Sequence, residues 1–176
     1  MRLLLPLSYI AFVTLTACQP SPETGSESLT IDLISSAGED IGDVTITDAG
    51  DAGVTLAVTA RKIAEGPHGI HFHVKADCQT PDFKSAGGHI NPEGHKHGLD
   101  HPEGPDNADM PNAVADAQDN LSYAYTNERV TLVKRDNRPA LLDADGSSLM
   151  IHINADDQIT QPIGGAGARI ACAEIK

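Results

Sequence analysis

The 176-residue chain carries 25 Asp and Glu residues against 12 Lys and Arg residues, which gives a net charge of −13. This charge disfavours nucleic acid as a partner, because contacts to phosphates need basic side chains. Aromatic residues make up 3% of the chain, and no long helical periodicity is present. Length and pattern therefore favour one small β domain with a core of its own over a helical bundle.

The first 18 residues are predicted to be an export signal. Arg2 precedes an apolar run over residues 3–15, which is typical of a secretory signal and too short to span a bilayer as a helix. The run ends in Leu-Thr-Ala-Cys at residues 15–18, which resembles a bacterial lipobox. That resemblance implies cleavage before Cys18 and attachment of lipid to this cysteine. An ordinary signal peptide with an incidental cysteine is the alternative.

Residues 19–28 are polar and rich in Pro and Ser, so we expect a flexible tether there. Residues 29–176 then form the folded domain. Loss of Arg2 with the signal leaves 11 basic against 25 acidic side chains, a net charge of −14. The expected location is the periplasm, with lipid on Cys18 as a membrane anchor. Gln19 is not the aspartate that retains bacterial lipoproteins in the inner membrane, so the outer membrane is expected.

Alternation of apolar and polar residues predicts a series of β-strands. They lie at residues 29–33, 44–46, 54–58, 69–75, 121–125, 129–133, 149–153 and 168–175. Asp and Gly at residues 48–53 predict a turn that joins the second and third strands into a hairpin. We expect an all-β fold, an antiparallel Greek-key sandwich or barrel of about eight strands with long metal-binding and disulfide-bearing loops.

Seven of the eight histidines lie within residues 68–109. Two of them alternate with apolar residues in the strand at 69–75, so His71 and His73 are expected to project together from one face. The residues expected to face the core are Ile70, Phe72 and Val74. His89 follows a Gly-rich turn. Several imidazoles delivered to one place predict a site for copper, zinc, iron or nickel rather than calcium or magnesium.

Residues 78–120 show no periodicity, and irregular stretches of this length are usually functional or disordered. We expect a metal and a disulfide to order them. Cys78 and Cys172 form an even pair in an exported chain, where an oxidised pair is favoured. Two unrelated thiols are the alternative.

Five blocks of this sequence resemble the copper/zinc superoxide dismutase family, and they occur in the family's order. They are GIHFH at residues 69–73, SAGGHINP at 85–92, HG at 97–98, IHINADD at 151–157 and GGAGARIAC at 164–172. The resemblance covers most of residues 65–176, whereas the N-terminal strands match in pattern alone. It implies a β-sandwich or barrel that binds copper and zinc, with Cys78 and Cys172 as an intrasubunit disulfide.

The resemblance implies four copper ligands, namely His71, His73, His89 and His152. His152 lies in a predicted strand whose apolar residues take the opposite face, so it can project toward the site. Arg169 matches the arginine that guides the anionic substrate. Asp156 matches the carboxylate that links a copper histidine to a zinc histidine.

The resemblance also implies a zinc site, in which His89 is shared with copper and His97 and Asp109 are further ligands. The fourth ligand departs from the family, because Asp106 stands where a histidine belongs and Ala108 replaces a glycine. Asp106 could bind zinc through oxygen, and this is the ligand set that we predict. Alternatively His101 or His95 completes the site, or zinc binds weakly or not at all.

The function implied by the resemblance is dismutation of superoxide to oxygen and hydrogen peroxide by a redox-cycling copper. The alternatives are a copper-binding or copper-delivery lipoprotein without turnover and, more distantly, a structural β module. A homodimer is a further expectation. A net charge of −14 repels superoxide at long range, so attraction must be local, from copper, Arg169 and a lysine such as Lys84.

Overall fold

The computed structural model describes residues 27–176. The predicted signal peptide, the lipidation site at Cys18 and nearly all of the predicted tether lie outside the described residues. Within residues 27–176, no helix has the length and apolar character needed to cross a membrane.

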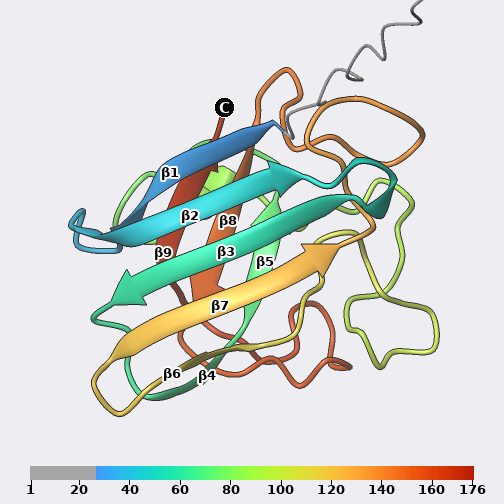
Figure 1. Ribbon diagram of the computed structural model, residues 1–176. Coiled ribbons are helices and arrows are strands. Elements are labelled where there is room, and N and C mark those ends of the chain that lie inside the picture. The colour runs from blue at the N-terminus through green and yellow to red at the C-terminus, as the bar shows by residue number, and fades with distance from the viewer. Residues whose placement is uncertain (1–26) are drawn as a thin grey trace, which may run out of the picture.

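Nine antiparallel strands and two short 3-10 turns make up the regular structure of residues 27–176 (Figure 1). The strands are β1 (Ser28–Ser35), β2 (Asp40–Asp48), β3 (Val54–Arg61), β4 (Gly66–His68), β5 (Ile70–His73), β6 (Ala113–Ala115), β7 (Asn120–Asn127), β8 (Ser147–His152) and β9 (Arg169–Ile175). The turns are η1 (Gly50–Ala52) and η2 (Lys84–Ala86). The all-β antiparallel prediction is confirmed, and so is the hairpin, in which Asp48 of β2 pairs with Val54 of β3 across η1.

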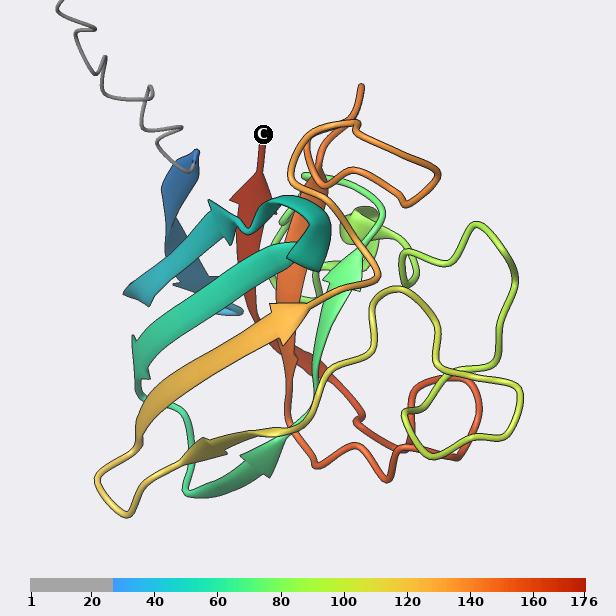
Figure 2. The same ribbon diagram turned by 45° about the vertical axis from the view of Figure 1, so that its right-hand side comes forward.

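The sheet closes into a barrel because of how its two end strands are connected. The strand order is β4-β6-β7-β3-β2-β1-β9-β8-β5, so β4 and β5 lie at opposite ends of the sheet. Gly69 alone separates these two strands in the chain. The sheet must therefore curl back on itself, and Figure 2 shows the resulting nearly closed barrel.

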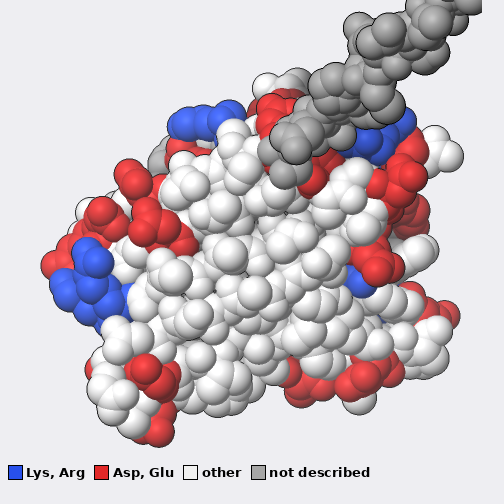
Figure 3. All heavy atoms as spheres, viewed as in Figure 1, with Lys and Arg blue, Asp and Glu red and all other residues white. Residues whose placement is uncertain are grey.

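The two halves of the barrel wall differ in what covers them. Along β3 the burial alternates residue by residue, with Val54, Leu56 and Val58 in the core and Thr55 outside. The outer face of β1, β2, β3 and β7 is largely uncharged (Figure 3). By contrast, every residue of β5 and β8 is buried, because the long loops that follow them pack on the outside of the barrel (Figure 2). Side chains that point out of the core there are enclosed rather than solvated.

The predicted strand at residues 129–133 is wrong. Its apolar residues Val130 and Leu132 are buried, which explains the alternation in the sequence. Their backbone, however, bonds within the loop between β7 and β8, and Thr131 forms an isolated bridge with Ala140. Alternating apolar residues indicate which side chains are buried, and here the buried side chains belong to a loop that closes the barrel end.

The strands β4 and β6 were not predicted, and Val74 was wrongly expected in the core. β4 and β6 have three residues each, which is too short for an alternating pattern to be recognised. Val74 was expected in the core with Ile70 and Phe72, but β5 ends at His73 and Val74 is 38% exposed. The chain leaves the barrel wall at this point and enters the long loop.

A disulfide joins Cys78 to Cys172, with 5.8 Å between their Cα atoms. This confirms the bridge that the family resemblance implied. It ties the start of the β5–β6 loop to β9 and buries Phe83, Ala86 and Met150 around it. The long irregular segment is therefore held against the barrel at its beginning.

Candidate metal centre

Four histidines converge outside the barrel wall, and we call His71, His73, His89 and His152 the copper set. β5 supplies the first two, β8 ends at the last, and the β5–β6 loop brings in His89. An isolated bridge between His73 and His89 fixes that loop against β5. Ring centroids lie 4.4 Å apart for His71 and His89, and 5.1 Å apart for His71 and His152. The structure thus brings together the four histidines that the family resemblance assigned to copper.

Each ring of the copper set has one nitrogen engaged and one free. The engaged contacts are His71 Nε2 with Asp156 Oδ2 (2.8 Å), His73 Nδ1 with the Gly87 carbonyl (3.0 Å), His89 Nδ1 with Asp106 Oδ2 (2.9 Å) and His152 Nδ1 with the Gly167 carbonyl (3.0 Å). The free nitrogens are His71 Nδ1, His73 Nε2, His89 Nε2 and His152 Nε2, all buried and without a hydrogen-bond partner among the described residues. A buried polar atom without a hydrogen-bond partner lowers the stability of the fold by about 1–3 kcal/mol. Four such nitrogens on neighbouring rings fit a metal, and all-nitrogen ligation suits copper.

Burial favours the neutral form of three of these rings. It lowers the pKa of His71 and His73, and together with His71 it lowers the pKa of His152 to about 3. A neutral imidazole has a lone pair to give to a metal, whereas an imidazolium has none.

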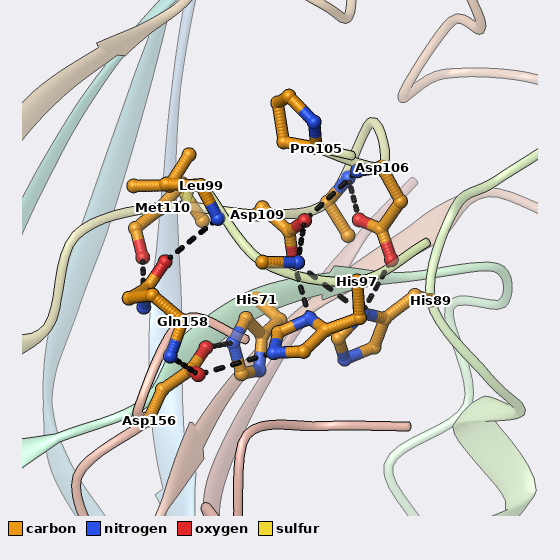
Figure 4. Close-up of polar contacts among 12 residues, drawn as sticks. His71, His89, His97, Leu99, Pro105, Asp106, Asp109, Met110, Asp156 and Gln158 are labelled. Atoms are coloured by element: carbon orange, nitrogen blue, oxygen red, sulfur yellow. Dashed lines mark hydrogen bonds and ion pairs between the residues drawn. The ribbon is translucent and has the colours of Figure 1, made fainter. Parts of the chain in front are cut away.

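A second group of ligand atoms lies on the other side of His89. Atoms of His89, His97, Asp106 and Asp109 all lie within 4.8 Å of one another, and Figure 4 shows them pointing toward a common position. His97 Nδ1 lies 2.6 Å from Asp109 Oδ1, and both atoms are buried without a well-aligned hydrogen bond in the described structure. Both residues are among the candidate ligands of this group, so both atoms are available to a shared metal.

The loop that carries this second group is fixed by hydrogen bonds to its backbone. Asp109 Oδ2 accepts from the amides of Gly98 at 2.7 Å and Asp106 at 2.8 Å. The Arg129 guanidinium donates to the carbonyls of both Asp106 and Asp109. Sequence reasoning missed this role, because Arg129 was assigned to a strand and its partners lie about 20 residues away.

Asp156 joins the two groups. Its two oxygens contact His71 Nε2 at 2.8 Å and His97 Nε2 at 3.1 Å (Figure 4). Burial opposes ionisation of this carboxyl, but the hydrogen bonds from His71 and His97 outweigh it and lower the pKa of Asp156. Burial also lowers the pKa of His97, yet Asp109 and Asp156 together raise it to about 10 in the metal-free protein. Asp156 therefore lies between His71 and His97 and contacts both rings.

The two alternative histidines do not join the second group. His95 Nδ1 lies 3.1 Å from the Pro105 carbonyl, and its side chain is exposed at the mouth of the site. His101 Nδ1 accepts from the amide of Glu103 at 3.0 Å. Neither ring is among the converging ligand atoms.

His68 is a further residue that sequence reasoning did not use. It is buried in β4, and its two ring nitrogens each lie 2.8 Å from a carbonyl oxygen, one of His152 and one of Ala64. It therefore supports the backbone of a copper-set residue instead of offering a ligand.

Arg169 borders the cavity that leads to the copper set. This cavity of about 500 Å³ is lined by His73, His89, His152 and Arg169 among others. Arg169 donates to the carbonyls of Phe83 at 2.6 Å and Gly87 at 2.5 Å, so its guanidinium is fixed on the disulfide-bearing loop. Lys84 was also expected to attract the anionic substrate. It instead forms an exposed ion pair with Asp82 at 2.8 Å.

Comparisons with known proteins agree with this geometry. The model of the copper/zinc superoxide dismutase family matches residues 41–175. The Cu-Zn superoxide dismutase of Caulobacter vibrioides is 49% identical over 140 residues, which cover 79% of this chain and 80% of that protein. The Escherichia coli enzyme of the same name is 33% identical over 97% of both chains. A crystal structure of a superoxide dismutase-like protein from Bacillus subtilis matches with a TM-score of 0.79 and 33% identity, over 84% of this chain and 97% of that one.

Proposed function

Because the chain belongs to the copper/zinc superoxide dismutase family and converts superoxide to oxygen and hydrogen peroxide, we propose that the copper set holds its redox-active copper. The single observation that carries this assignment is that each of these four neighbouring rings has one buried nitrogen with no hydrogen-bond partner among the described residues. Copper, when bound, supplies the one-electron chemistry by which superoxide is alternately oxidised and reduced.

The residues around the copper set would bind the substrate and handle protons. Arg169 is the cation of the cavity, and its rigid guanidinium can hydrogen-bond an anion beside the copper set. His89 Nε2 could carry one of the two protons that hydrogen peroxide requires when it is not holding copper. Asp156 fixes the orientation of His71 and His97, as carboxylates commonly do for metal-binding histidines.

We also propose that zinc is held by His89, His97, Asp106 and Asp109. Zinc accepts nitrogen and carboxylate oxygen in tetrahedral sites, and the second group offers two of each. A site with two carboxylates is more anionic and harder than one with three imidazoles. It should therefore discriminate less strongly in favour of zinc over other divalent ions.

The expected export and anchoring form part of the proposal. Residues 1–18 would be removed as a lipoprotein signal, lipid on Cys18 would anchor the protein to the outer membrane on its periplasmic side, and residues 19–28 would tether the domain. The disulfide supports an oxidising compartment. Mass spectrometry of the protein isolated from membranes tests the lipid, and light scattering tests the expected homodimer.

The rival function is copper binding or delivery without turnover. A carrier needs the ligands but not a cation in the cavity, so the placement of Arg169 favours the enzyme. The test is dismutase activity of the purified protein loaded with one equivalent of copper, with and without zinc. Activity that tracks the copper content supports the proposal, and bound copper without activity favours the carrier.

A further inference from the structure

Asp106 differs from the other groups that accept hydrogen bonds from the copper set, because the nitrogen that it contacts could bind zinc instead. Two members of the set, His73 and His152, are oriented by main-chain carbonyls, and His71 is oriented by Asp156. His89 is oriented by Asp106, whose Oδ2 lies 2.9 Å from Nδ1. In the proposed two-metal enzyme, zinc would occupy this same nitrogen.

We propose that Asp106 is a positioning residue that takes the place of zinc at His89, so that the copper set is complete without zinc. With zinc bound, Asp106 is a ligand. Without zinc, its carboxylate accepts a hydrogen bond from the Nδ1–H of His89. That hydrogen bond leaves Nε2 as the lone-pair nitrogen, directed into the copper set.

The carboxylate is held in place for this second role. Asp106 is 2% exposed, and its Oδ1 accepts from the amide of Ala108 at 2.8 Å. Its own amide donates to Asp109 and its carbonyl accepts from Arg129. One oxygen and the backbone are thus fixed by the protein, which leaves Oδ2 facing His89.

Asp109 does not share this role. Its Oδ1 lies 3.9 Å from His89 Nδ1, beyond hydrogen-bond distance, and its Oδ2 accepts two backbone amides. The two carboxylates of the second group can therefore be separated by mutation. This inference rests on the proposed copper set, but it makes a different prediction, namely that copper affinity does not depend on zinc.

The experiment is a copper titration of the purified full-length protein after removal of metals with a chelator, with and without one equivalent of zinc, followed by the EPR spectrum of Cu(II). Asp106→Ala removes the acceptor. Asp106→Asn keeps an acceptor oxygen but is a poor zinc ligand. Asp109→Asn weakens the zinc site without touching His89. Asp100→Ala is the control for charge, because Asp100 is exposed in the same loop.

We expect the parent protein to bind copper with the same affinity and a four-nitrogen EPR signature whether or not zinc is present. Asp106→Ala should lower the zinc-free copper affinity roughly 10–100-fold, the loss typical for the partner of a metal-binding histidine. Asp106→Asn should restore most of that affinity but not zinc binding. Asp109→Asn still offers an oxygen to the amide of Asp106, so it should keep more zinc-free copper affinity than Asp106→Ala. Asp100→Ala should leave that affinity unchanged.

Two results would overturn the inference. One is a parent protein that loses copper affinity on zinc removal to the level of Asp106→Ala, and the other is an Asp106→Ala protein that binds copper as well as the parent. Circular dichroism and thiol titration check that the variants fold and keep the disulfide. A Cu(II) spectrum without four nitrogens in every protein would instead contradict the proposed copper set, so the two failures are distinguishable.

Discussion

The two halves of the metal centre are built by different means. Three residues of the copper set lie on β5 and β8, where the sheet ladder fixes each Cα, and two of these rings bond to backbone carbonyls. The other half lies on an irregular loop that is fixed by the side chains of Asp109 and Arg129. A backbone carbonyl survives any substitution, whereas a side-chain partner does not. The loop half is therefore the one in which a ligand can change type, as we propose for Asp106.

Removal of the disulfide should have the largest effect, a loss of folding stability, because it releases the loop that covers the copper half. The bridge closes a chain segment with a sequence separation of 94. Loops of this length correspond to about 4–5 kcal/mol in the chain-entropy model. Denaturant unfolding of the metal-free Cys78→Ser/Cys172→Ser protein should show a loss of that order. An unchanged midpoint would mean that the bridge does not constrain the fold.

Loss of a strand-borne ligand comes next. His73→Ala should reduce copper affinity and dismutase activity by more than the roughly 10–100-fold typical of residues one contact further from a metal. His101→Ala is the matched control, because His101 lies outside both converging groups, and it should keep its activity and zinc content. Loss of zinc from His101→Ala would restore this histidine as a ligand.

A substitution in the loop half should separate the two metals. Arg129→Met removes the donors to the carbonyls of Asp106 and Asp109, so zinc affinity should fall about 10–100-fold. Copper affinity should fall by less, because the amide of Ala108 still holds Oδ1 of Asp106. Arg135→Met serves as the control, since Arg135 pairs with Asp48 on another part of the surface. Calorimetric titration measures both metals. Equal losses of copper and zinc would show that the halves are not independent.

The smallest expected effect concerns ionic strength. Net negative charge repels superoxide, and Arg169 attracts it only locally, so long-range steering should be weak. Between about 0.01 and 0.15 M salt the screening length falls from roughly 30 to 8 Å. The second-order rate should nevertheless change by less than the roughly 10-fold or more seen with steered association. A steep fall of the second-order rate as salt is added would indicate a positive electrostatic potential at the cavity despite the negative net charge.

The same contrast explains what could be predicted from the sequence. The period-two pattern around His71, His73 and His152 predicts that each projects from the face opposite the apolar residues of its strand, whereas their assignment to copper came from the family resemblance. Arg129 was misassigned because its alternation reflects a buried loop, and the short β4 and β6 carry no pattern. The contact between His89 and Asp106 spans 17 residues of irregular chain, and no local rule specifies such a contact.

The most direct test is anomalous X-ray diffraction from crystals loaded with copper and zinc, recorded at both absorption edges. We predict a copper peak bonded to His71, His73, His89 and His152. We also predict a zinc peak about 2.0–2.2 Å from ligand atoms of His89, His97, Asp106 and Asp109. A copper peak away from the four histidines would contradict the central assignment.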